Sequence, residues 1–83
     1  MEKKVEDAIE LIDAIGEDTS VPKNIRRALS EAKERLKGKE DELSTRVSAA
    51  IYLIEAVSED INMPMHARTQ IWTILSALES IKS

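Results

Sequence analysis

The second half of this 83-residue chain repeats the first half at a fixed offset of 42 residues, without a gap. Residues 5–37 align with residues 47–79, and eleven of the 33 aligned pairs are identical. Some apolar matches can arise by chance, so the charged and proline pairs are the specific ones: Glu17/Glu59, Asp18/Asp60, Pro22/Pro64 and Arg26/Arg68. The chain is therefore predicted to consist of two related units that share one local structure.

Within each unit the apolar residues recur every three or four positions, which is the pattern of an α-helix with one buried face. The pattern predicts four helices, at about residues 2–16, 22–37, 42–58 and 63–81. No segment alternates apolar and polar residues with a period of two, so no β-strand is predicted.

Two helices joined by a short turn cannot bury their apolar faces alone, whereas two such hairpins can bury them against each other. We therefore predict an all-α fold, namely an antiparallel up-and-down four-helix bundle made of two pseudo-symmetric αα-hairpins. The whole chain, residues 1–83, should form a single helical-bundle domain. Helix-pair repeats also build HEAT and armadillo solenoids, but those need about three repeats for stability.

Residues that commonly end or begin helices lie between the predicted segments. Gly16 follows the first apolar stripe and suits a left-handed cap at the end of a helix. Ser20 and Asn62 are of the types that cap a helix N-terminus, and Pro22 and Pro64 fit the first turn of the next helix. Both hairpins are thus predicted to turn at corresponding positions.

Composition excludes several classes of function. The chain has no cysteine, which rules out disulfides, thiolate catalysis and zinc sites built from cysteine. Its net charge of −4 argues against a dedicated nucleic-acid binder, because such domains are usually basic. No apolar stretch approaches the ~20 residues of a membrane span. Residues 1–7 lack the apolar run of a signal peptide, so we expect a cytoplasmic protein without membrane contact.

The repeated polar residues gather in the two predicted turns, which an up-and-down bundle places at the same end. One interpretation is a composite polar site for a ligand or a partner's tail. We favour a structural interpretation, in which each arginine binds carboxylates or open carbonyl groups of its turn. The structural turn candidates are Glu17, Asp18, Pro22, Arg26, Glu59, Asp60, Pro64 and Arg68.

Two other polar features carry weak signals. His66 is the only histidine, and Thr69 and Gln70, one turn away, are poor metal ligands, so a structural role is predicted and no metal site is expected. Residues 22–39 hold seven basic side chains against two acidic ones. This could be a footprint for RNA phosphates, but aromatic residues that stack on bases are missing, and a solvated helix face is the favoured interpretation.

Three large side chains lie beside the predicted core stripes of the last two helices: Tyr52, Met65 and Trp72. Such residues are enriched in protein interfaces, which makes them a possible interaction surface or homodimer contact. The alternative is that a small bundle needs a wide apolar stripe and Trp72 covers its side.

The run from Ser58 to Trp72, with Val21–Ala28 upstream, resembles an uncharacterised family of small archaeal proteins. Its specific part is Asn62-Met63-Pro64, followed by His66-Ala67-Arg68-Thr69 and Ile71-Trp72. The resemblance extends over nearly the whole chain and implies an up-and-down four-helix bundle in an archaeal cytoplasm. It implies no catalytic residue, because the family has none assigned.

The sequence therefore predicts a small non-enzymatic protein-interaction or scaffold module. No nucleophile–base pair, glycine-rich loop or metal-ligand spacing is visible, so neither a catalytic site nor a cofactor is expected. The alternative is an RNA- or ribosome-associated accessory protein that uses the basic second helix. A protein partner or a second copy of the chain is the expected binding partner, and nucleic acid is the less favoured one.

Overall fold

The computed structural model describes residues 3–39 and 41–82, and their regular secondary structure is entirely helical. The helices are α1 (Lys3–Gly16), α2 (Lys23–Lys37), α3 (Leu43–Glu55) and α4 (Met65–Lys82). The prediction of an all-α chain with four helices is therefore confirmed, and most bounds agree within two residues. Residue 2, where the first predicted helix begins, lies outside the described residues.

Helix α3 ends three residues before its predicted end at residue 58. The N–H groups of Val57 and Ser58 donate to the carbonyl groups three residues back, at Ile54 and Glu55. This tighter turn ends the α-helix at Glu55, although the apolar period continues to Val57.

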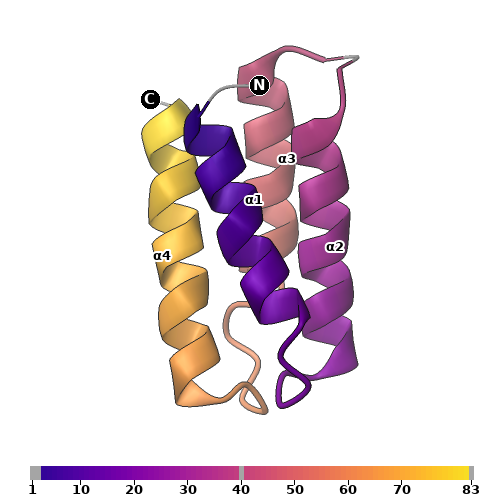
Figure 1. The fold of residues 1–83 in the computed structure, drawn as a ribbon, viewed down its shortest axis with the longest axis vertical. Coiled ribbons are helices and arrows are strands. Elements are labelled where there is room, and N and C mark those ends of the chain that lie inside the picture. Colours follow the sequence, from indigo (N-terminus) through magenta and orange to yellow (C-terminus); the bar gives the residue numbers. More distant parts are fainter. Residues whose placement is uncertain (1–2, 40, 83) are drawn as a thin grey trace.

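The four helices lie side by side along the long axis of the molecule, which measures 33 × 20 × 19 Å (Figure 1). Helices α1 and α3 each contact both α2 and α4. The α1–α2 and α3–α4 connections lie at one end, which we call the turn end (Figure 1). The α2–α3 connection, the start of α1 and the end of α4 lie at the opposite end.

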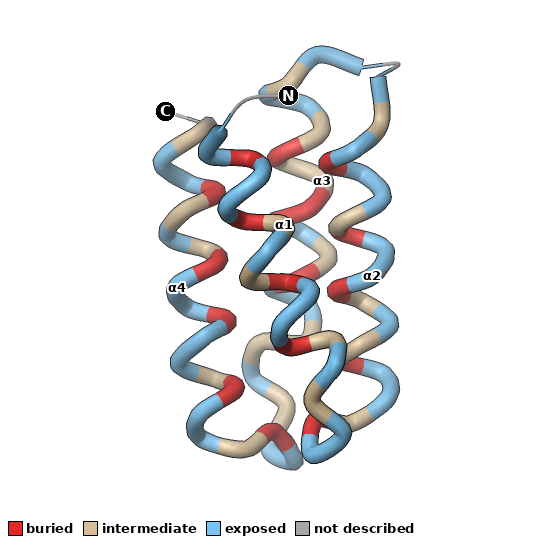
Figure 2. The backbone as a smooth tube through the Cα atoms, viewed as in Figure 1, coloured by how far each residue is buried: buried red, intermediate tan, exposed pale blue. Residues whose placement is uncertain are grey.

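The core is a continuous set of aliphatic side chains along the inward faces of the helices (Figure 2). Many positions that correspond in the repeat are buried in both halves: Val5/Val47, Ala8/Ala50, Ile12/Ile54, Leu29/Ile71 and Leu36/Leu78. Burying one large aliphatic side chain contributes roughly 1.5–3 kcal/mol. Among residues 3–39 and 41–81, no polar or charged residue is buried, so candidate chemistry lies at the surface.

The predicted helix caps are wrong in detail. Gly16 is not left-handed, because no glycine in the described part of the chain has a positive φ. It is instead the last residue of α1, and the next N–H, that of Glu17, still donates to Asp13 at 3.1 Å. Ser20 does not cap α2, which begins after Pro22 without a side-chain cap.

Candidate interaction surface

The two acidic turns have the same local structure. A carboxylate oxygen Oδ1 of Asp18 accepts from the N–H of Ser20 at 2.9 Å, and Oδ1 of Asp60 accepts from that of Asn62 at 2.8 Å. The hydroxyl of Ser20 also donates to Asp18. An aspartate that binds the backbone two residues ahead stabilises a turn, which explains why Ser20 and Asn62 serve the turns and not the helix starts.

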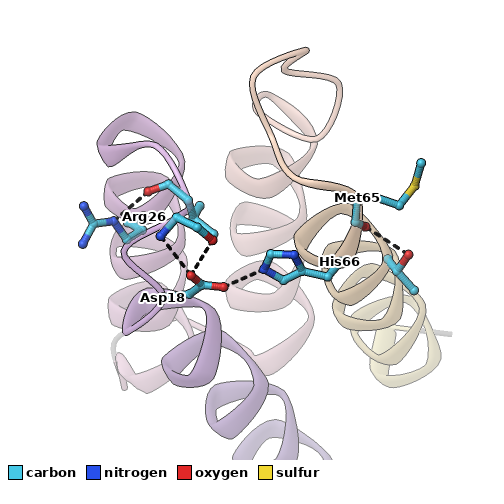
Figure 3. A network of polar contacts seen from close by, with 7 residues as sticks. Asp18, Arg26, Met65 and His66 are labelled. Carbon is cyan, nitrogen blue, oxygen red and sulfur yellow. Dashed lines mark hydrogen bonds and ion pairs between the residues drawn. The ribbon is translucent and has the colours of Figure 1, made fainter.

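Each aspartate also reaches across to the second residue of a helix in the other half of the chain. Nε2 of His66 lies 2.7 Å from Oδ2 of Asp18, and Nδ2 of Asn24 donates to Oδ2 of Asp60 at 3.1 Å. Figure 3 shows His66 of α4 pointing at the turn that follows α1. Positions 24 and 66 differ by the same 42 residues as 18 and 60, so the two contacts correspond.

The hydrogen bonds of the turns favour the ionised form of both aspartates. The pKa of Asp18 falls from 3.8 to about 2, first because of the Ser20 hydroxyl and then because of the hydrogen bond with His66. The pKa of Asp60 is also lowered, mainly by the backbone N–H of Asn62 and then by the side chain of Asn24. An ionised carboxylate only accepts hydrogen bonds, so Nε2 of His66 is the donor.

This cluster lacks the order that nucleophilic catalysis requires. In a catalytic triad the imidazole lies between the hydroxyl and the carboxylate, so that it can remove the hydroxyl proton. Here Asp18 lies in the middle and binds both Ser20 and His66. The arrangement joins the first turn to α4 and leaves the serine hydroxyl bound to a carboxylate.

Both repeated arginines bind carbonyl groups of the turn that precedes their own helix. Nε of Arg26 donates to the carbonyl of Val21 at 3.0 Å (Figure 3). Nη2 of Arg68 donates to the carbonyl of Asp60 at 3.3 Å, while its Nε is buried without a partner. The carbonyls of Pro22 and Pro64 accept the backbone N–H groups of these arginines, at 3.1 and 3.0 Å.

A shallow depression lies beside each arginine, and the two differ in chemistry. The one beside Arg26 has a volume of about 430 Å³ and a largely polar lining that includes Gly16, Glu17, Ser30 and Lys33. The one beside Arg68 has a volume of about 300 Å³ and is lined by Ser58, Glu59, Ile61, Arg68 and Trp72. Trp72 is the repeat counterpart of Ser30, so the second depression has an indole ring where the first has a hydroxyl group.

The large hydrophobic residues that are exposed in the described chain all lie in its second half. They are Tyr52, Ile61, Met65 and Trp72, with exposed fractions of 74, 89, 75 and 59%. The corresponding residues of the first half are all polar or charged: Glu10, Thr19, Lys23 and Ser30. We call these four exposed residues the apolar surface.

Sequence reasoning singled out Tyr52, Met65 and Trp72 but missed Ile61. Ile61 follows the acidic pair in the second turn, where an apolar residue has no period to mark it. Comparison with its repeat position, Thr19, would have revealed it, because no apolar residue is needed at that point of the fold.

The exposed face of α4 is also unusually poor in charge. Between Asp60 and Glu79 the one residue among Asp, Glu, Lys and Arg is Arg68, in a chain where such residues make up 34%. Five exposed charged residues of α2 are replaced by neutral ones at the corresponding positions of α4. The pairs are Lys23/Met65, Arg27/Thr69, Glu31/Thr73, Glu34/Ser76 and Arg35/Ala77. Depletion of charge is characteristic of the central part of protein interfaces.

The basic residues of the second helix do not form an uninterrupted cationic face. Nζ of Lys33 pairs with Asp13 at 2.7 Å, and the guanidinium of Arg26 is bound to a backbone carbonyl. Glu31 and Glu34 are exposed on the same helix. The other five basic residues of this stretch are exposed, so the RNA interpretation remains an alternative.

Two further features are absent from the described residues. No group of three or more His, Cys, Asp or Glu side chains there could hold a metal ion. None of the four helices is long and apolar enough to cross a membrane.

Comparison with known proteins assigns the chain to a family. Residues 1–81 match the model of an uncharacterised protein family, UPF0147. The chain belongs to this family. A UPF0147 protein of Pyrococcus horikoshii is 47% identical over 83 residues, covering 99% of this chain and 89% of the relative. A UPF0147 protein of Sulfolobus acidocaldarius is 46% identical over 81 residues, covering 98% and 91%.

Two crystal structures have closely similar folds. One is of a protein of unknown function, MMP1188, which is 48% identical with a TM-score of 0.91 over 96% of this chain and 91% of the other. The second is of a UPF0147 protein from Thermoplasma acidophilum, which is 30% identical with a TM-score of 0.89, covering 96% and 93%. The predicted resemblance to an archaeal family is confirmed, and the UPF0147 family has no established function.

Proposed function

We propose that this protein is a small interaction module without catalytic activity, and that it binds another protein through the apolar surface. The observation that carries the proposal is the contrast between the two halves of one repeat. Tyr52, Ile61, Met65 and Trp72 are exposed in the second half, where the first half has four polar or charged residues.

Comparing the two halves distinguishes residues that the fold requires from residues that it does not require. A buried residue that the fold needs should have an apolar counterpart in the other half, as the buried residues of the described chain do. The residues of the apolar surface have dissimilar counterparts, so the fold does not require them. Exposed Trp, Tyr and Met beside a face without charge match the composition of a protein interface.

Contacts between the two halves of the chain hold the apolar surface in place. We infer an antiparallel up-and-down bundle of two pseudo-symmetric hairpins in a single domain, residues 1–83. The corresponding contacts Asp18–His66 and Asn24–Asp60 support this, because each joins one hairpin to the other. His66 immediately follows Met65, so the first contact also holds the start of the α4 face in place.

The test replaces the residues of the apolar surface by the polar and charged residues found at the corresponding positions of the first half. A surface variant carries Tyr52→Glu, Ile61→Thr, Met65→Lys and Trp72→Ser, each introducing the residue found at the corresponding first-half position. Wild type and variant are immobilised and exposed to native cell extract, and retained proteins are identified by mass spectrometry. The proposal expects specific proteins, or the chain itself, on the wild type and not on the surface variant, with unchanged circular dichroism.

A matched control variant carries Arg27→Thr, Glu31→Thr and Glu34→Ser, which give α2 the neutral residues of α4. It should retain the same proteins as the wild type. If the surface variant binds what the wild type binds, the apolar surface is not the binding site. Salt-sensitive retention of RNA that is lost when Lys23→Met, Arg27→Thr and Arg35→Ala remove cations from α2 would instead establish the basic-helix alternative.

A further inference from the structure

Two residues of the apolar surface have a spacing that suits self-association. Met65 and Trp72 are seven residues apart, which is two helical turns, or about 10 Å along one face of α4. Thr69 lies between them on that face and is exposed. The side chain of Met65 points away from the contact between Asp18 and His66 (Figure 3), so it is free to meet another surface.

We propose that the partner bound by the apolar surface is a second copy of this chain. The two α4 helices pack antiparallel about a two-fold axis that passes close to Thr69. This dimer rests on the proposed function, because it identifies the partner that the apolar surface binds. The axis brings Met65 of each copy against Trp72 of the other, so the same contact forms twice, as a two-fold interface requires. Methionine sulfur packs favourably on aromatic rings, which suits this pair.

The charge distribution favours a second copy over a partner chosen by charge. Each chain has a net charge of −4, so two copies repel each other through most of their surfaces. Seven exposed residues between Met65 and Ser76 include no Asp, Glu, Lys or Arg. The charged residue of this stretch, Arg68, is half-buried and binds the carbonyl of Asp60, so two copies can join through this face without opposing fully exposed like charges. A partner selected by electrostatic complementarity would need charges here to recognise.

Two hydroxyl groups of the α4 face are already satisfied within the helix. Oγ1 of Thr69 donates to the carbonyl of Met65 at 3.2 Å, and Oγ1 of Thr73 donates to the carbonyl of Thr69 at 3.1 Å. Burying these threonines against a second copy leaves no hydroxyl donor unpaired, which removes a common cost of covering polar residues.

The size of the interface brings α3 into it as well. A specific interface buries about 800 Å² on each partner. One helix is only about 10 Å wide, whereas the long side of the molecule measures 33 by 20 Å. The dimer therefore uses the adjoining outer surface of α3 together with α4, and this includes Tyr52.

The first experiment is sedimentation of wild type, Thr69→Arg and Arg27→Thr from micromolar to millimolar concentration. These substitutions exchange the residues of two corresponding exposed positions. Thr69→Arg places two like charges at the axis and should weaken dimerisation at least about tenfold. Arg27→Thr should leave it unchanged. A wild type that stays monomeric throughout overturns the inference, as does a dimer weakened equally by both substitutions.

The second experiment uses the absence of cysteine in the natural sequence. The single-cysteine variants Thr69→Cys and Arg27→Cys are oxidised at equal concentration. A covalent dimer should form much faster with Thr69→Cys, because a disulfide needs the two Cα atoms within about 7 Å. Equal rates overturn the placement of the axis. If the wild type is monomeric but extract proteins still distinguish it from the surface variant, the proposed function stands and only the second copy is excluded.

Discussion

Replacing Arg26 by alanine should destabilise the protein more than replacing Arg68, although the two residues correspond in the repeat. Nε of Arg26 donates at 3.0 Å to the carbonyl of Val21, a residue with 1% exposure. Removing the guanidinium leaves that carbonyl without its donor, which costs about 1–3 kcal/mol. Arg26 is itself half-buried, so packing of its aliphatic stem is lost too. We expect a total near 2 kcal/mol.

The corresponding loss at Arg68 is smaller for two reasons. Its bond to the carbonyl of Asp60 is longer, at 3.3 Å, and Asp60 is only half-buried, so water can replace the donor. Its Nε is buried without a partner, and the alanine substitution removes that unsatisfied donor. We therefore expect Arg68→Ala to cost less than about 1 kcal/mol.

Urea unfolding followed by circular dichroism measures both free energies of unfolding. In a chain of this size 1 kcal/mol corresponds to about 4–8 °C, so Arg26→Ala should lower the melting temperature by about 10 °C. The variants Arg26→Met and Arg68→Met keep an apolar stem and separate its packing from the hydrogen bond. A cost for Arg68→Ala equal to or above that of Arg26→Ala would refute the reasoning. Two unchanged melting curves would reopen the interpretation of the turns as a ligand site.

Two further predictions concern Gly16 and Asp18. Gly16→Ala should stabilise the protein by about 0.4–1 kcal/mol, because an added Cβ meets no atom within 4 Å and φ is not positive; a lower melting temperature would contradict this. The folded-state pKa of Asp18 is about 2, below its ordinary value of 3.8, so its contribution to stability is present above about pH 4 and is lost as the pH falls toward 2. The stabilities of wild type and Asp18→Asn should therefore converge on acidification, and a difference that does not change with pH would show that the carboxylate charge contributes nothing.

Local physical chemistry determines the features that could be predicted from the sequence. An apolar residue at every third or fourth position favours a helix whatever surrounds it, so four helices could be placed from their own residues. Pro22 and Pro64 mark where α2 and α4 begin for the same reason, since proline is excluded only from later turns. The repeat likewise indicated that both turns should resemble each other, and their Asp18 and Asp60 hydrogen bonds do correspond.

Capping could not be predicted because one side chain can choose between two competing hydrogen-bond partners. Ser20 can cap a helix or bind the carboxylate of Asp18, and the sequence contains both options. Arg26 and Arg68 likewise bind carbonyls at positions that do not correspond, Val21 and Asp60, through different nitrogens. The repeat in the sequence does not indicate which of several nearby carbonyls an arginine will bind.

The sequence by itself determined the helices, the turns and the apolar face of each helix, because these follow from the pattern of residues close along the chain. Only the tertiary structure decided which side chains from distant parts of the chain come into contact. Asp18 and His66 are 48 positions apart, and their contact exists because the packing of α1 against α4 brings the turn end together. The exposure of Trp72 was equally undetermined, since the same helical position faces a neighbour or solvent according to how closely the adjoining helix packs.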